Sequence, residues 1–395
     1  MLPRASSRMP AEGVSVVDSP VSIDCPSLGT VVPGFDPVLE LLRQFAQADL
    51  GYSAQLCVIH AGARVVDVTV GTALRPDSLV CVYSSGKGIA GLCVSRLVQA
   101  GEVDLDRPFS AYWSKFGAAE KKGITVRTAL SHRAGLVGVE GGFSVEEVVE
   151  HSGLASRLAA TAPMWTPGLV HGYHAVTIGT MIEELVARVT GMSFQKFYRE
   201  VQDALGVDFY FGVPIHARAR VVAVEPPSEP IDEDWLTNPL SIRGAAFGGG
   251  RMPTLAEYAR HPAVVTGGPV GFGGFGNARS LAELYAAALG TGYFAGRAVR
   301  EMSQIHSAGE DLVLGVDNRF GVVFQAPDSR LDFGSPWSFG HDGAGGTIAY
   351  ADPARNLAFA YVPSRIPAPP GADSRGLALS KVVRDCLREI RRSAN

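Results

Sequence analysis

Strand-like segments lie near both ends of the chain, whereas the middle of the chain has few of them. Residues 54–71 contain two runs rich in β-branched residues on either side of Ala61-Gly62, which is typical of a β-hairpin. A second hairpin is predicted over residues 346–364, with Asp352-Pro353 in its turn. From about residue 108 to 265 the pattern favours helices and loops. We therefore expect an α/β domain built from both ends of the chain, with a mostly helical domain inserted between them.

Amphipathic segments accompany these predicted strands. Residues 36–51 carry apolar residues at a helical spacing, and so do residues 374–392 near the other end of the chain. Asn277 is predicted to be the N-cap of a further helix, which follows a glycine-rich loop. The apolar positions expected to face the core are Val38, Leu41, Leu42, Phe45 and Leu50 in the first segment, and Leu377, Val382, Val383, Cys386, Leu387 and Ile390 in the last.

The polar residues 1–32, with their scattered prolines and glycines, predict a leader that lies over the surface. The predicted domains are then a discontinuous α/β domain, residues 33–107 plus 266–395, and a helical domain, residues 108–265. With 395 residues, of which 46% are apolar, the chain is long enough to bury a large core in such an arrangement.

The charge and cysteine content narrow the range of partners and compartments. The net charge is −4 and basic residues do not gather into a large patch, so we expect neither a nucleic acid nor an anionic membrane as partner. The five cysteines are scattered and odd in number, which argues against a disulfide framework or a zinc site. No apolar run reaches 18 residues, and the first residues lack the apolar core of a signal peptide. A soluble cytoplasmic protein is the resulting expectation.

Lys87 lies in one of the least polar segments of a chain that has only six lysines. If residues 84–98 form a helix, Ser84 and Lys87 are one turn apart and point to the same side. A serine hydroxyl becomes a good nucleophile when a base takes its proton, and burial favours the neutral, basic form of a lysine. Ser84 would also begin the helix, where backbone N–H groups face any negative charge that develops. The segment therefore predicts a nucleophile and its base.

The S-x-x-K spacing alone is a weak indication, because a chain of this composition often contains one match by chance. Ser193 and Lys196 form a second match within this same sequence. There the flanking apolar residues predict an ordinary amphipathic helix, with Ser193 as its N-cap and Lys196 in solvent. Only the first match lies in an apolar environment, and only that one is interpreted as catalytic.

Four segments in the same order resemble one superfamily. Residues 84–113 ("SSGKGIAGLCVSRLVQ…") resemble the S-x-x-K region of penicillin-binding-protein-like serine hydrolases, and residues 124–136 ("ITVRTALSHRAGL") are similar to the stretch that follows it. Residues 172–198, beginning "GYHA", and residues 340–353, beginning "GHDG", resemble the second and third motifs. This superfamily includes class C β-lactamases, D-alanyl-D-alanine peptidases and family VIII carboxylesterases. The resemblance implies a β-lactamase-like fold, with an antiparallel sheet flanked by terminal helices and an inserted helical domain.

The resemblance also implies roles for particular residues. Ser84 would be the acylated nucleophile, Lys87 its base or proton relay, and Tyr173 the group that passes a proton to the leaving group. His341 would lie near the substrate and Ser84, and the oxyanion hole would consist of the backbone N–H groups of Ser84 and Ala344.

The third motif would also contribute to substrate binding. Asp342, Gly343 and Gly345 would line the strand along which the substrate lies, because glycines leave room beside a strand. The resemblance implies no cofactor and no metal ion.

Two departures from the superfamily pattern favour its esterase branch. The second motif reads Tyr173-His174-Ala175, without the asparagine amide that would hold a β-lactam or a peptide, and the third motif has His341 in place of lysine. A histidine at that position is expected to change its charge near neutral pH. The predicted function is hydrolysis of small carboxylic esters through an acyl-Ser84 intermediate.

Three alternatives remain open at this stage. An acyltransferase, which passes the acyl group to a small-molecule or natural-product alcohol or amine, would use the same residues. A β-lactamase or D-amino-acid peptidase is less compatible with Ala175, and a catalytically inactive binding protein is less compatible with the joint presence of Ser84, Lys87 and Tyr173.

Two other patterns carry little weight. Residues 271–276, "GFGGFG", match a dinucleotide-binding spacing but lack the βαβ unit that such a site needs, so we expect a loop beside the active site. His171 and His174 are three residues apart, yet no third ligand converges on them, so no metal site is expected.

Overall fold

A computed structural model describes residues 27–231 and 238–393 of this chain. Its main sheet has six strands in the order β1-β3-β2-β11-β10-β9, and every neighbouring pair is antiparallel. Both predicted hairpins are confirmed, and Ala61 and Gly62 have the positive φ angles of a two-residue hairpin turn. The strands are β1 (Ser27–Val31), β2 (Ala54–His60), β3 (Ala63–Val70), β9 (Phe339–Asp342), β10 (Ile348–Asp352) and β11 (Leu357–Pro363).

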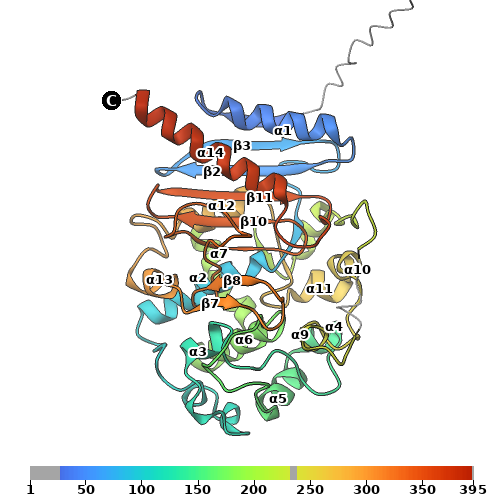
Figure 1. Ribbon diagram of the computed structural model, residues 1–395, viewed down its shortest axis with the longest axis vertical. Coiled ribbons are helices and arrows are strands. Elements are labelled where there is room, and N and C mark those ends of the chain that lie inside the picture. Colours follow the sequence, from blue (N-terminus) through green and yellow to red (C-terminus); the bar gives the residue numbers. More distant parts are fainter. Residues whose placement is uncertain (1–26, 232–237, 394–395) are drawn as a thin grey trace, which may run out of the picture.

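The sheet is covered on both faces, so β2, β9, β10 and β11 are buried along almost their whole length, whereas the edge strand β1 is largely exposed. The terminal helices α1 (Asp36–Ala48) and α14 (Ser374–Ser393) lie against one face, and α12 (Ala278–Ala286) lies against the other (Figure 1). Asn277 caps α12 by accepting a hydrogen bond from the Ser280 amide, as predicted. The β-lactamase-like α/β arrangement expected from the sequence is therefore confirmed.

The terminal helices bury a narrower face than the sequence pattern indicated. In α1 the fully buried side chains are Val38, Leu42 and Ala46, while Leu50 lies beyond the end of the helix and is 73% exposed. In α14 Leu379 is buried and Ile390 is 38% exposed. The period of the pattern identified the helices, but the angle at which each helix meets the sheet selects the residues that become buried.

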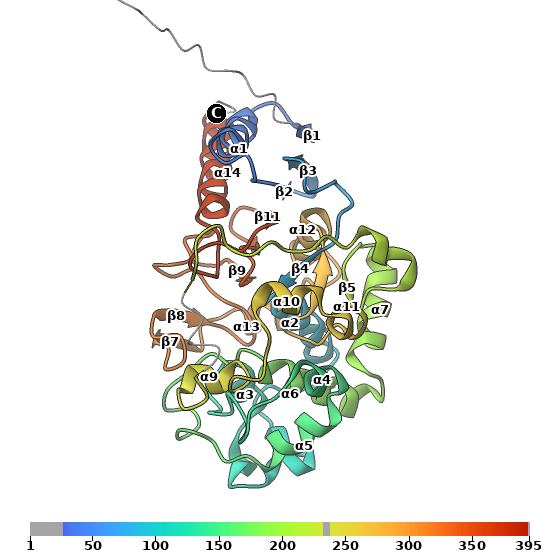
Figure 2. The ribbon, with the colours of Figure 1, turned by 90° about the vertical axis from the view of Figure 1, so that its right-hand side faces the viewer.

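Helix α2 (Ser85–Gln99) runs through the centre of the molecule, between the main sheet and the helical region (Figure 2). Nearly every side of α2 is buried, because β9 and α13 (Arg297–Met302) contact it from different directions, as does α6 (Thr177–Thr190). Ser84 and Lys87 are thereby placed in the interior.

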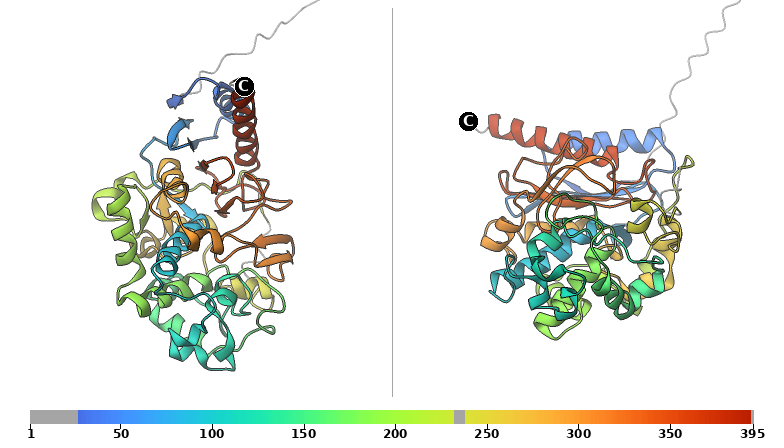
Figure 3. Two further views of the ribbon diagram at one scale, coloured as in Figure 1. Left: turned by 90° about the vertical axis from the view of Figure 1, so that its left-hand side faces the viewer. Right: turned by 60° about the horizontal axis from the view of Figure 1, so that its bottom comes forward.

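The remaining elements form the helical region and two small sheets, on the side of the main sheet opposite α1 and α14 (Figure 3). The small sheets are β4-β6-β5, from β4 (Val80–Tyr83), β5 (Tyr210–Phe211) and β6 (Gly274–Gly276), and β7-β8, from β7 (Ser307–Glu310) and β8 (Asp317–Phe320). The other helices are η1 (Phe109–Ala111), η2 (Ser114–Gly117), η3 (Lys121–Gly123), α3 (Val126–Leu130), α4 (Val145–Glu150), α5 (Ser152–Ala160), α7 (Phe194–Leu205), η4 (Ile215–Arg220), α9 (Ile242–Ala246), α10 (Leu255–Arg260) and α11 (Pro262–Gly267).

The segmentation predicted from the sequence differs from the structure in two places. Residues 27–31, which were assigned to the leader, form the edge strand β1, because their backbone pairs with β3. The rest of the predicted leader, residues 1–26 with Cys25, lies outside the described residues. Part of the glycine-rich segment 271–276, expected to be a loop, forms β6. The remaining four cysteines are buried and free.

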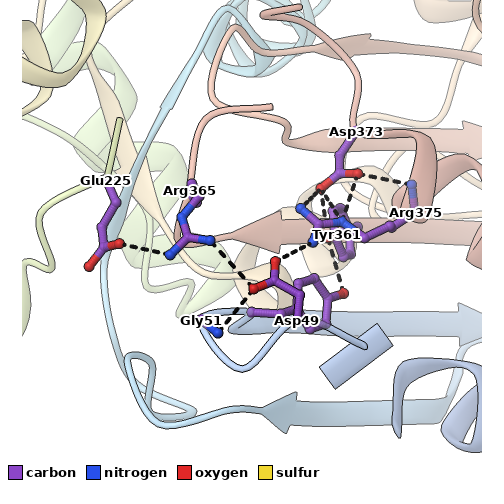
Figure 4. Close-up of polar contacts among 8 residues, drawn as sticks. Asp49, Gly51, Glu225, Tyr361, Arg365, Asp373 and Arg375 are labelled. Atoms are coloured by element: carbon purple, nitrogen blue, oxygen red, sulfur yellow. Dashed lines mark hydrogen bonds and ion pairs between the residues drawn. The ribbon is translucent and has the colours of Figure 1, made fainter. Parts of the chain in front are cut away.

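A network of ion pairs fastens the segment after η4 to the main sheet (Figure 4). Arg365, just after β11, lies 3.5 Å from Asp49 and 3.2 Å from Glu225, and Arg375 bridges Asp49 and Asp373. The Glu225 amide also donates to the Ser364 carbonyl, and the Glu225 carbonyl accepts from the Ile366 amide, so the backbone of Glu225 pairs with the residues on either side of Arg365. The network holds in place the segment that leads to residue 231 at the edge of the cavity described below.

In the part of the chain that the structure describes, no helix is both long and apolar enough to span a membrane.

Candidate active site

Ser84 lies at the junction of β4 and α2, and this junction is strained. The preceding residue, Tyr83, has a φ of 47°, in the left-handed region that a bulky residue seldom adopts. The surroundings hold it there: the Tyr83 ring is fully buried and its hydroxyl donates a hydrogen bond to the Leu255 carbonyl at 2.8 Å. The Ser84 side chain consequently begins the helix at the edge of a cavity, and Ser84 is 7% exposed.

Lys87 contacts Ser84 and is completely buried. Its Nζ lies 3.0 Å from Ser84 Oγ and donates to the carbonyls of Ala175 and Gly271, each at 2.7 Å. Burial lowers the pKa of Lys87 well below its usual value. A neutral amine has two N–H bonds and one lone pair. In that neutral form the two carbonyls, which can only accept, would take both N–H bonds, and the lone pair would face Ser84 Oγ.

Tyr173 completes this group of side chains. Its ring stacks on Phe320 with centroids 5.8 Å apart, and Lys87 Nζ lies 5.0 Å from its ring centroid. Burial raises the pKa of Tyr173 above its usual value, and contact with the Ser84 side chain opposes part of that rise. The phenol is therefore protonated at neutral pH and able to donate a proton beside Ser84 Oγ.

The backbone around Tyr173 is held by buried polar groups that the sequence reasoning missed. The Tyr173 amide donates to Asp311 Oδ1 at 3.0 Å, and the His174 amide donates to His132 Nδ1 at 3.0 Å. His174 Nε2 accepts from the Leu136 amide at 3.0 Å. Both imidazoles must be neutral to accept these bonds, and burial lowers the pKa of His174 to about 4.

His132 lies in a turn, with a φ of 63°, and its ring also fixes the second motif. Asp311 carries no local pattern that reveals its role, because its partner Tyr173 is far away in the sequence.

His341 lies inside the group but does not reach open space. Its ring is fully buried 6.0 Å from the Tyr173 ring, and its Nδ1 donates to the Asp342 carbonyl at 2.7 Å. Burial lowers the pKa of His341 to about 3. The expectation that this histidine changes charge near neutral pH is therefore wrong, because burial penalises its charged form.

The turn after β9 brings the third motif against β4. A side chain on Gly343 would overlap the Val82 carbonyl, and a Cβ on Gly345 would lie 2.6 Å from the Tyr83 ring. These glycines permit close packing of the turn on the strand that carries Ser84, whereas the sequence suggested that they leave room for substrate. Ala344, between them, does line the cavity. Neither its amide nor that of Ser84 donates to another group among the described residues.

A cavity of about 580 Å³ opens in front of Ser84 and Tyr173. A cavity of this size accommodates a small organic molecule. Its other polar lining residues are Gln325, Arg330, Asp342 and Arg243. Its walls are otherwise largely apolar and include Ile231, Phe247, Phe272, Leu314, Val316, Pro369 and Pro370.

The patterns that were set aside also have structural explanations. Ser193 caps α7 and accepts a hydrogen bond from the Lys196 amide, so the helical interpretation of that S-x-x-K match is confirmed. His171 Nε2 contacts Asn318 at 2.8 Å, and His174 bonds to backbone groups. Across residues 27–231 and 238–393, no three His, Cys, Asp or Glu side chains are arranged to hold a metal ion.

Comparison with known proteins identifies the family of this chain. The model of the beta-lactamase family matches residues 41–383. The chain belongs to the beta-lactamase family. It is 31% identical over 344 residues to the esterase/beta-lactamase LipL of Mycobacterium tuberculosis, covering 80% of this chain and 77% of LipL.

Solved structures of the family are also similar. EstA from Arthrobacter nitroguajacolicus Rue61a has a TM-score of 0.85 and 37% identity, with 91% of this chain and 98% of EstA covered. A family VIII carboxylesterase has a TM-score of 0.82 and 28% identity, with 91% of this chain and all of that chain covered. A penicillin-binding-protein homologue from Caulobacter crescentus has a TM-score of 0.80 and 29% identity, with the same coverage. The chain is thus an enzyme of the β-lactamase/esterase superfamily, as the sequence resemblance implied.

Proposed function

We propose that this chain is a serine esterase that cleaves small carboxylic esters through an acyl-Ser84 intermediate. The observation that carries the proposal is the placement of Lys87 Nζ, 3.0 Å from Ser84 Oγ, fully buried and bound to two carbonyls. Burial favours the neutral, basic form of this lysine, and a neutral amine can take the proton of the serine hydroxyl.

The proposed reaction begins when Ser84 Oγ attacks the ester carbonyl carbon and its proton passes to Lys87. The negative charge that develops on the carbonyl oxygen is stabilised by the amides of Ser84 and Ala344. The tetrahedral intermediate then breaks the bond to the alcohol oxygen. Tyr173 protonates that oxygen and is reprotonated by the Lys87 ammonium. Water repeats the sequence on the acyl-enzyme, and the carboxylic acid leaves.

Two further observations support ester hydrolysis over β-lactam or peptide hydrolysis. Ala175 is fully buried and offers only its carbonyl, which binds Lys87, so the second motif provides no side-chain amide for a substrate. Of the similar proteins, the family VIII carboxylesterase, at 28% identity, carries an esterase name alone, whereas the name of LipL, at 31% identity, gives both esterase and beta-lactamase.

Acyl transfer is the second candidate, and the cavity wall favours it as an alternative. Phe247, Phe272, Leu314 and Val316 present apolar surface beside Ser84. Such a wall disfavours water and can accommodate an organic alcohol as the acyl acceptor.

The test is to measure the intact mass of the protein after incubation with p-nitrophenyl butyrate and with a fluorophosphonate, while p-nitrophenol release is recorded. We expect one covalent adduct and steady turnover, both absent in Ser84→Ala. Adding alcohols then separates hydrolysis from transfer, because transfer yields a new ester. Absence of both labelling and turnover in the wild type would refute the esterase proposal.

A further inference from the structure

Asp342 and Arg330 form an ion pair on the wall of the cavity that contains Ser84. Arg330 Nη1 lies 2.8 Å from Asp342 Oδ2, and both residues line the cavity. The Asp342 side chain is 10% exposed and that of Arg330 is 33% exposed. Asp342 is two residues before Ala344, in the turn that follows β9, so the two residues are at most about 7 Å apart along the chain. A substrate whose carbonyl lies at the Ala344 amide would therefore reach this pair with a group a few bonds away.

The carboxylate is held firmly in this position. Asp342 Oδ2 also accepts the Ala372 amide at 2.9 Å, and the Asp342 amide donates to Gln325 Oε1 at 2.7 Å. Gly371 covers the pair: a Cβ at this position would lie 3.5 Å from Asp342 Oδ2 and 3.7 Å from Arg330 Nη1. Arg330 and Gln325 hold the pKa of Asp342 at about 2, so it is ionised throughout the physiological range.

The pair leaves this part of the wall without net charge. The guanidinium of Arg330 is paired with Asp342 through Nη1. Its Nε is buried and makes no hydrogen bond within the described residues. A carboxylate that reaches this pair would lose hydration and face the charge of Asp342, while the guanidinium of Arg330 is already paired. Without Asp342, the guanidinium of Arg330 would present a planar set of donors suited to a carboxylate.

We propose that Asp342 is a specificity-determining residue, which keeps Arg330 from binding substrate carboxylates and so restricts the enzyme to esters that are uncharged at the end facing this wall. The inference rests on the proposed esterase function, since it specifies the substrate class of that site. It predicts opposite effects for the two members of the pair. Removal of Asp342 favours anionic substrates, and removal of Arg330 favours cationic ones.

The experiment uses substrates that differ mainly in charge. One series is phenyl butyrate with a carboxylate, a methyl ester or a trimethylammonium group in the para position, which places the charge on the leaving group. The other is the 4-nitrophenyl ester of adipic acid and of monomethyl adipate, which places the charge on the acyl group. For each substrate kcat/KM of a variant is divided by that of the wild type, so that intrinsic reactivity cancels.

One of the two series places its charged end at the Asp342–Arg330 pair. In that series we expect Asp342→Asn to raise kcat/KM for the anionic substrate, relative to the neutral one, at least tenfold. The side-chain amide oxygen introduced by this substitution can still accept the Ala372 amide. Arg330→Gln is expected to lower the same ratio at least tenfold and to raise cationic turnover, and the double variant should lose the gain in anionic turnover. Asp352→Asn is the matched control, because Asp352 is a buried carboxylate paired with Arg355 at 2.7 Å at the far end of β10. It should leave the ratios unchanged.

A binding measurement keeps this inference separate from the esterase proposal. In Ser84→Ala chains, calorimetry should detect adipate binding only when Asp342→Asn is also present, and dimethyl adipate should bind equally to both. Suppose that esters are turned over, but both charge variants shift the anionic-to-neutral ratio in the same direction or neither variant shifts it. This result would overturn the specificity inference and leave the esterase proposal standing. If no ester is turned over but adipate binding still requires Asp342→Asn, the inference about the cavity wall would be supported and the esterase proposal would be refuted.

Discussion

His151 forms a charged bridge to Glu183 and Glu184 in α6. Its removal should change how the free energy of unfolding depends on pH. Its Nδ1 lies 2.6 Å from Glu183 Oε2 and its Nε2 lies 3.1 Å from Glu184 Oε1. Glu183 in turn accepts the Val270 amide at 3.2 Å, next to the Gly271 carbonyl that binds Lys87. The two glutamates more than offset the burial of the imidazole and raise the pKa of His151 to about 10.

The magnitude follows from this pKa. A folded-state pKa of about 10, against 6.5 in the unfolded chain, corresponds to about 4–5 kcal/mol at about 1.4 kcal/mol per pH unit. The imidazole is 23% exposed, and screening by solvent reduces this to about 2–3 kcal/mol. Because the pKa is raised on folding, this stability is fully present below pH 6.5 and is lost as the pH rises towards 10.

The assay is urea denaturation of the wild type and of His151→Gln at pH 6.5 and pH 9.5. Between these two values the wild type should lose about 2–3 kcal/mol more of its free energy of unfolding than the variant loses. His216→Gln, at an exposed position in η4, is the control and should behave like the wild type. Equal losses in the wild type and in His151→Gln would refute the argument that the imidazolium bridge contributes this stability.

Three further predictions concern the site itself. Lys87→Met should lower kcat/KM about 10²–10⁴-fold without unfolding the protein, as measured with p-nitrophenyl butyrate and circular dichroism, because the base is lost. Gly88→Ala should destabilise the protein by about 1–3 kcal/mol in urea denaturation, since a methyl group there overlaps the Tyr285 hydroxyl, and Tyr285→Phe should restore part of that loss. The ring protons of His341 should not titrate between pH 5 and 8 in NMR spectra, because its pKa is about 3; a midpoint near 6.5 would contradict its burial.

The sequence determined the features that depend on neighbouring residues. The two hairpins, the terminal helices and the Asn277 cap follow from turn residues, periodicity and capping, which act over a few positions. The same short-range logic separated the Ser193 match, an N-cap, from the apolar Ser84 match. The resemblance of four ordered segments gave the family, which the comparisons confirm.

The tertiary structure decided the properties that depend on burial and on distant partners. Lys87 has a lowered pKa because it is buried, and carbonyls far away in the sequence, at Ala175 and Gly271, hold its Nζ beside Ser84. His341 stays neutral because packing excludes water from its ring, although histidine as a residue type titrates near neutral pH. The sequence by itself therefore determined which side chains are present and roughly which elements carry them. Their protonation states and partners arise only when distant segments pack together, because desolvation and Coulomb interactions depend on distance in space.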